Sequence, residues 1–152
     1  MRTGTLVGFA LVIAIAYTST VTAQQPEKAA PRSSADAIAR MSQRRIFFGH
    51  QSVGENVLDG IQKLAREAPG TQLKVVQSED KEALQSPGLV HAMVGRNEDP
   101  ASKIKHFERL MTEGPGVNAE VAFFKFCYID FDPNTDVEKL FADYQASVKV
   151  LK

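Results

Sequence analysis

The chain has 152 residues, and its 18 lysine and arginine residues are balanced by 18 aspartate and glutamate residues. This balance, without a basic run, excludes the phosphate-facing surface that nucleic-acid-binding proteins need. Cys127 is the single cysteine, which excludes an internal disulfide, so a packed core must hold the fold together.

The N-terminal segment is typical of an export signal. Arg2 precedes an apolar stretch from Leu6 to Tyr17, and Val21-Thr22-Ala23 places small residues before a cleavage site. We expect a secreted or periplasmic protein without a membrane segment once the signal is removed; a retained N-terminal anchor is the alternative. The expected organisation is a signal peptide at 1–23, a flexible leader at 24–34 and one domain at 35–152.

Helices and strands alternate along the rest of the chain, which predicts a three-layer α/β/α fold with a mostly parallel, flavodoxin-like sheet. The strand at 121–126 is uniformly apolar, which indicates burial on both faces. In the first half of the chain we expect a helix at 35–43, a strand at 45–48, a helix at 52–67 and a strand at 72–77. An irregular stretch follows at 78–100, with one or two helical turns at 89–94. In the second half we expect a helix from Ser102 to Gly114, the strand at 121–126 and a helix from Thr135 to Leu151.

The end of the chain leaves this fold incomplete. The last helix runs into Lys152 without a glycine cap or a proline stop, and a three-stranded parallel sheet has exposed edges. We therefore expect the chain to be the N-terminal part of its domain, or to rely on a partner chain that completes the sheet.

Ser52 is the main candidate for chemistry, because it lies between a predicted strand and a predicted helix. In one interpretation Ser52 and Glu55 form a capping box. In the other, the Ser52 hydroxyl is a nucleophile beside the free N–H groups of a helix start, which can stabilise an oxyanion. The flanking Gly49 and Gly54 favour the second interpretation slightly, since they allow another backbone to approach closely.

The segment Phe47–Asn56, together with Lys125-Phe126-Cys127-Tyr128, resembles exported members of the SGNH (GDSL-like) hydrolase superfamily, in which the serine lies in a His-x-Ser-Val-Gly turn. The resemblance covers about 45–151 and implies that Ser52 is the nucleophile. It implies oxyanion and substrate-binding roles for Gly95 and, more weakly, Asn97, although a type-II turn or a helix stop explains Gly95 equally well. The chain departs from the family pattern, since it lacks the Asp beside the serine, an asparagine after the 121–126 strand and the Asp-x-x-His motif.

The remaining candidates have simpler interpretations. His50 either acts as a base or, as we expect from its place two residues before Ser52, hydrogen-bonds the turn or contacts substrate. We expect His91 and His106 at the surface, and Cys127 as a small apolar side chain, with a lysine-activated nucleophile as the alternative. Lys125 interrupts an apolar strand, so it needs either a carboxylate partner or a functional role. We list Asp130 and Asp132 as its candidates.

The resemblance implies an exported serine ester hydrolase that forms an acyl-enzyme on Ser52, with a histidine base from beyond Lys152. The implied substrate is a small-molecule or glycan ester. No cofactor is expected, and no metal, because the histidines and carboxylates lack ligand spacing. The alternative is a non-catalytic exported module on the same fold that binds a ligand or partner through the loop 78–100.

Overall fold

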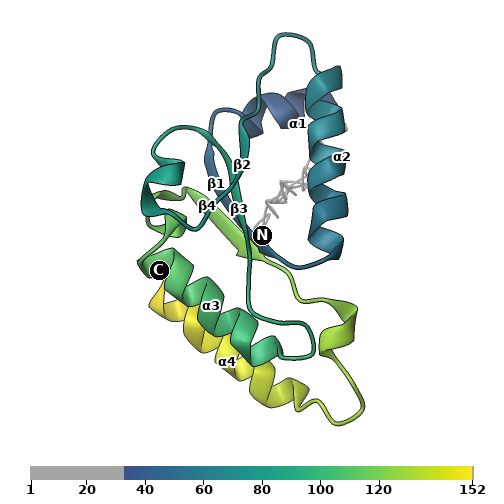
Figure 1. Cartoon of the computed structure of the whole chain (residues 1–152), viewed down its shortest axis with the longest axis vertical. Coiled ribbons are helices and arrows are strands. Elements are labelled where there is room, and N and C mark those ends of the chain that lie inside the picture. The colour runs from purple at the N-terminus through teal and green to yellow at the C-terminus, as the bar shows by residue number, and fades with distance from the viewer. Residues whose placement is uncertain (1–32, 152) are drawn as a thin grey trace, which may run out of the picture. The chain divides into compact units, whose positions relative to one another are not determined.

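The computed structural model describes residues 33–151, so the predicted signal peptide and the predicted leader up to residue 32 lie outside the described residues. Helices and strands alternate along the described chain (Figure 1). Short 3₁₀ turns occupy Lys81–Leu84, Pro115–Asn118 and Tyr128–Asp130. The main elements are α1 (Ser34–Met41), β1 (Arg45–His50), α2 (Val53–Glu67), β2 (Val75–Gln77), β3 (Gly88–Met93), α3 (Pro100–Thr112), β4 (Val121–Phe124) and α4 (Val137–Val150).

All strand pairs of the described sheet are parallel, which confirms the predicted parallel α/β fold. The strand order is β2-β3-β1-β4, so β1 lies inside the sheet with β3 and β4 on either side. When the short edge strand β2 is set aside, the order β3-β1-β4 is that of the first three strands of a flavodoxin-like fold. Because the strands are parallel, the carboxyl ends of β1, β3 and β4 lie at the same end of the sheet. Ser52 follows β1 at this end.

Strand β3 corrects the prediction of helical turns at 89–94. Its first five residues are buried, and it pairs with β1 on one side and with β2 on the other. The segment is apolar on both faces because both faces are covered, and a short apolar run gives no periodicity that separates a strand from a helix. The predicted 23-residue irregular stretch consequently contains a central strand.

Two apolar clusters lie on opposite faces of the sheet and place the helices in two layers (Figure 1). On one face Leu58 of α2 packs against Phe48 of β1. On the other face Phe47 stacks on Phe107 of α3, with ring centroids 5.9 Å apart. Gly49 lies beside this second contact. A Cβ on Gly49 would be 2.8 Å from Val94 Cγ1, so no larger residue fits there without a shift of its neighbours. The sheet is thus covered by α1 and α2 on one side and by α3 and α4 on the other.

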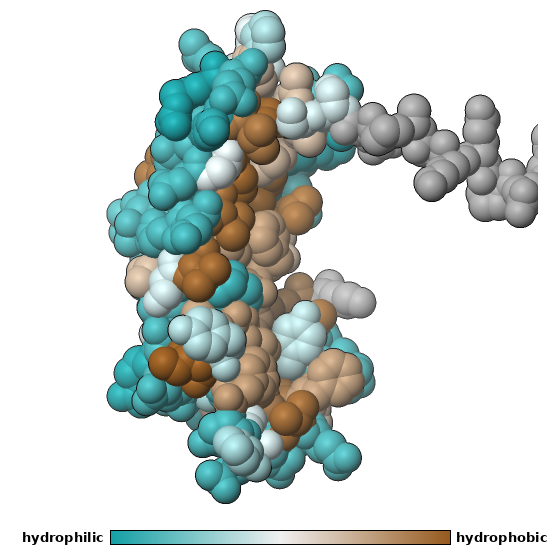
Figure 2. Space-filling view, turned by 90° about the vertical axis from the view of Figure 1, so that its right-hand side faces the viewer, coloured by the Kyte–Doolittle hydropathy of each residue, from teal (hydrophilic) through white to brown (hydrophobic). Residues whose placement is uncertain are grey.

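Strand β4 is not buried on both faces, and this prediction was wrong. Val121 and Phe123 are 48% and 45% exposed, because β4 is an edge strand and nothing in the described chain covers them. They lie on the α2 side of the sheet, where Phe123 stacks on Phe48. Figure 2 shows hydrophobic side chains running down the side of the molecule that carries α2. We call Val121 and Phe123 the uncovered face of β4.

Helix α3 begins earlier and α4 begins later than predicted. Asp99, rather than Ser102, caps α3, because its side chain accepts a hydrogen bond from the Ser102 N–H. Asp136, rather than Thr135, caps α4 by accepting from the Lys139 N–H. In both cases a carboxylate at the N-cap position satisfies a free N–H of the first turn. None of the helices in the described part of the chain is both long and apolar enough to span a bilayer.

Candidate active site

The turn after β1 holds Ser52 in a backbone conformation that L-residues rarely adopt, with φ 35° and ψ −96°. Ser52 occupies the N-cap position of α2, but its side chain makes no capping hydrogen bond. The Glu55 N–H donates to the Ser52 backbone carbonyl instead, at 2.9 Å. The capping-box interpretation is therefore wrong. Non-glycine residues in such conformations cost about 1–3 kcal/mol and cluster at functional sites, so the strain is an observation in favour of function.

The Ser52 hydroxyl is exposed and faces the loop that follows β3. Asn97 Nδ2 donates to Ser52 Oγ at 3.3 Å. Within residues 33–151 the Ser52 N–H donates to no other group, so it is also free to bind an oxygen. The structure thus brings Ser52 and Asn97 together, with the Asn97 amide as the donor to the Ser52 hydroxyl.

Asn97 is itself held by a buried ion pair. Lys103 Nζ donates to Asn97 Oδ1 at 3.0 Å and to Asp130 Oδ2 at 2.6 Å. The side chains of Lys103 and Asp130 are both fully buried. Asp130 also accepts from the Cys127 N–H at 2.6 Å and from the Glu98 N–H at 3.1 Å. One carboxylate therefore joins α3, the turn after β4 and the loop after β3.

Gly95 supports this loop but does not offer an oxyanion donor. Its N–H donates to His106 Nδ1 at 3.0 Å and is already used. Its φ is +59°, and a Cβ at this position would lie 2.5 Å from the backbone nitrogen of Lys103. Gln51 Nε2 donates to the Gly95 carbonyl at 2.8 Å and so ties the turn after β1 to the same loop. The Gly95 N–H is therefore not free to stabilise an oxyanion, and Gly95 has a structural role in the loop.

His50 is completely buried, so its side chain is not accessible at the surface, and Ser52 Oγ is hydrogen-bonded to Asn97 rather than to His50. His50 Nε2 lies 3.0 Å from His91 Nδ1, and a Cβ on Gly54 would be 2.3 Å from His50 Cβ. Burial lowers the pKa of both histidines below their usual 6.5, although Glu55, 4.0 Å from His50 Nε2, opposes the shift. His50 is a neutral core residue under the first turn of α2.

Two other predictions about polar side chains fail. His91 is buried in β3 rather than exposed in a loop. Asp130 pairs with Lys103, and the contact made by Lys125 Nζ is with Cys127 Sγ at 3.4 Å. Cys127 is buried, as expected of a small apolar side chain.

The role of His106 is a hydrogen bond that sequence reasoning did not anticipate. The residue was expected at the surface, and it is partly exposed on α3. Its Nδ1 is the acceptor for the Gly95 N–H, and its Nε2 lies 3.5 Å from Glu79 Oε2. His106 thus anchors the start of the loop that carries Asn97.

Sequence reasoning missed Lys103, although a signal was present. Lys103, Phe107 and Leu110 follow at the i, i+4, i+7 spacing of one helix face, and the latter two were predicted to be buried. A lysine on a buried stripe requires a partner carboxylate. That requirement points to a distant acidic residue, which the structure identifies as Asp130.

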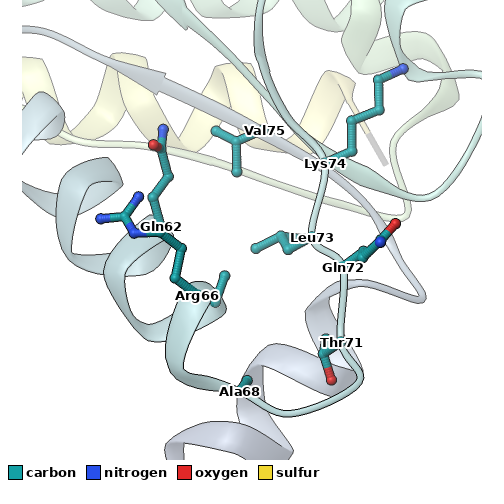
Figure 3. Close-up of a pocket in the computed structure, with 9 residues that line it drawn as sticks. Gln62, Arg66, Ala68, Thr71, Gln72, Leu73, Lys74 and Val75 are labelled. Atoms are coloured by element: carbon teal, nitrogen blue, oxygen red, sulfur yellow. The ribbon is translucent and has the colours of Figure 1, made fainter.

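Neither a metal centre nor the cavity beside α2 competes with this site in the part of the chain that the structure describes. Among residues 33–151, histidine, cysteine and carboxylate side chains form no group able to hold a metal ion. A cavity of about 630 Å³ lies between α2 and the segment leading into β2, with Leu73 pointing into it and Lys74 pointing away (Figure 3). It lies toward the amino end of the sheet, far along α2 from Ser52, and its lining contains no nucleophile beside a base.

The fold and the turn define a parallel α/β domain with a strained serine at the carboxyl end of its central strand. Comparison with protein-family models, with curated protein sequences and with solved structures gives no match. The functional argument therefore rests on the residues and distances of the site.

Proposed function

We propose that this chain carries the nucleophilic half of an exported serine ester hydrolase, with Ser52 as the nucleophile. The observation that carries the proposal is the strained backbone of Ser52, whose hydroxyl is exposed and takes no part in capping α2. A strand-to-helix turn of this kind presents a serine oxygen above the sheet in several hydrolase folds. The resemblance of the segment Phe47–Asn56 to SGNH-like hydrolases supports the same assignment.

The proposed chemistry is acyl transfer from an ester. Ser52 Oγ attacks the ester carbonyl carbon, its proton passes to a base, and the alcohol leaves as the acyl-enzyme forms. The Ser52 N–H and Asn97 Nδ2 donate to the negative oxygen of the tetrahedral intermediate. Water then attacks the acyl-enzyme and releases the acid. A small-molecule or glycan ester is the proposed substrate class, from the family resemblance.

The base must come from outside the described residues. Within residues 33–151, Ser52 Oγ makes its one hydrogen bond with Asn97, and no histidine or carboxylate contacts it. In the proposal a histidine is supplied by further chain or by a partner chain. A serine without its base keeps little activity, so residues 33–151 alone should turn over esters very slowly.

The test is labelling of the mature protein, in the form in which its own source makes it, with a fluorophosphonate. This probe forms a covalent bond to an activated serine oxygen with loss of fluoride, and mass spectrometry locates the adduct. We expect one adduct on Ser52, none in Ser52→Ala, and unchanged labelling in the control Ser86→Ala, which alters another exposed serine. Absence of an adduct on Ser52 would reject the hydrolase proposal.

The alternative is a non-catalytic exported module that binds a ligand or partner through the segment 78–100, which contains β3 and the loop after it. The buried Lys103–Asp130 pair favours a rigid loop after β3, and a binding module also needs rigid loops. The two functions differ in their response to Ser52→Ala. A binding module keeps its ligand affinity in this variant and shows no ester turnover in either form.

A further inference from the structure

Lys103 orients the Asn97 side chain. This orientation decides whether Asn97 presents a donor or an acceptor to Ser52 Oγ. Lysine has only donors, so the atom of Asn97 that faces Lys103 Nζ at 3.0 Å must be the carbonyl oxygen Oδ1. The amide nitrogen Nδ2 must then face Ser52 Oγ, where it donates at 3.3 Å. A rotated amide would set a carbonyl oxygen against the serine oxygen and would offer no donor to an oxyanion.

Lys103 is itself fixed in place. Its side chain is completely buried, and Asp130 Oδ2 holds the ammonium at 2.6 Å. Asp130 is fixed in turn by the backbone N–H groups of Cys127 and Glu98. The Lys103 backbone lies so close to Gly95 that a Cβ on Gly95 would be 2.5 Å from its nitrogen. The ammonium therefore cannot move away from Asn97 without disturbing three segments of the chain.

The charge on Lys103 also strengthens Asn97 as a donor. An ammonium that hydrogen-bonds an amide oxygen draws electron density away from the amide nitrogen, so that its N–H groups become better donors. This effect is larger in a buried pair than in water, because little solvent screens the charge. Replacing a buried ion pair with apolar residues of similar size is often neutral or stabilising, so stability alone is a weak explanation for the presence of Lys103 and Asp130.

We propose that Lys103 and Asp130 are positioning residues, which hold the Asn97 amide so that Nδ2 points at the oxygen that becomes negative above Ser52. This inference rests on the proposed hydrolase function for its catalytic consequence, but the orientation of the amide can be measured without catalysis. The pair acts through Asn97 and does not touch the reacting atoms.

The test combines Asn97→Ala with the double variant Lys103→Met/Asp130→Asn, which removes both charges and leaves no buried ion unpaired. The readouts are the rate of fluorophosphonate labelling at Ser52 and the hydrogen exchange of the Asn97 side-chain amide by NMR. Lys105→Met, an exposed lysine two residues along α3, is the control. Circular dichroism checks folding. If this double variant unfolds, Lys103→Leu/Asp130→Asn, which also leaves no buried ion unpaired, replaces it.

We expect the double variant to label at least about tenfold more slowly, and up to the roughly 10²–10³-fold loss typical of deleting one oxyanion donor. Because the pair acts through Asn97, adding the double variant to Asn97→Ala should cause no further loss. Additive losses, or an unchanged rate in the double variant, would overturn the inference.

The NMR readout separates this inference from the hydrolase proposal. If the unaltered protein does not label, the hydrolase proposal is rejected, and exchange of the Asn97 amide still decides the positioning role. Asn97 is exposed, so we expect a difference in rate rather than full protection: its amide should exchange faster in the double variant than in the unaltered protein and in Lys105→Met. Equal exchange rates in all three would overturn the positioning role whatever the labelling shows.

Discussion

Replacing Ser52 with glycine should stabilise the fold, because it removes backbone strain at φ 35° and ψ −96°. The strain of a non-glycine residue in such a conformation costs about 1–3 kcal/mol. Glycine relieves it but adds about 0.5–1 kcal/mol of unfolded-state entropy. The exposed hydrogen bond to Asn97 is also lost. The net gain is about 1 kcal/mol, which raises the melting temperature by about 4 °C in a domain of this size.

An ordinary helix cap predicts the opposite sign. If the Ser52 side chain capped α2, glycine would destabilise the fold by a few tenths of a kcal/mol and alanine by about 1 kcal/mol. In the structure alanine should be almost neutral, since no cap is lost. Ser33→Ala is the matched control, because Ser33 Oγ does cap α1 by accepting from the Asp36 N–H, and it should lose about 1 kcal/mol.

The assay is urea unfolding of the protein, with folding followed by circular dichroism. The reasoning requires the midpoint to rise in Ser52→Gly, to stay nearly constant in Ser52→Ala and to fall in Ser33→Ala. A fall in Ser52→Gly together with a larger fall in Ser52→Ala would show that Ser52 caps α2 and is not strained.

The remaining predictions concern the buried histidines and the helix above them. Gly54→Ala should destabilise the fold by about 1–3 kcal/mol, because the new Cβ would lie 2.3 Å from His50 Cβ. Gly60→Ala, on the same helix with open space around it, should instead stabilise by about 0.5–1 kcal/mol, and equal effects in urea unfolding would contradict the packing argument. Burial lowers the pKa of His50 and His91 in the folded state, so the unfolded chain binds more protons below its pKa of 6.5. Stability from this pair should be complete above about pH 6.5 and decline as the pH falls further, by up to about 1.4 kcal/mol per pH unit for each histidine. A urea midpoint that does not change as the pH falls below 6.5 would contradict the lowered pKa values.

The sequence predicted those parts of the fold that depend on local periodicity and on breakers. The helix at 52–67 and the strand at 45–48 were found because apolar spacing and the sequence Pro69-Gly70 define them locally. Strand β3 was missed because its burial on both faces comes from β1 and β2, which its own residues do not reveal. The exposure of β4 depends on its place at the edge of the sheet, which is also a tertiary property.

The candidate site was predictable in part. Ser52 could be singled out from the turn that contains it, and Asn97 was named as a weak candidate. Their contact could not be predicted, because it depends on the path of the loop after β3. The role of Lys103 depends on Asp130, which is 27 residues away in sequence. The burial of His50 was hidden for a similar reason, because its partner His91 comes from the strand that was missed.

The uncovered face of β4 has a consequence for handling the protein. The outer edge of β4 offers unpaired backbone groups, beside Val121 and Phe123, to any strand that approaches. Edges of this kind are templates for aggregation. Purified 33–152 should therefore become turbid as its concentration rises, and Phe123→Lys should delay this by placing a charge beside the free edge.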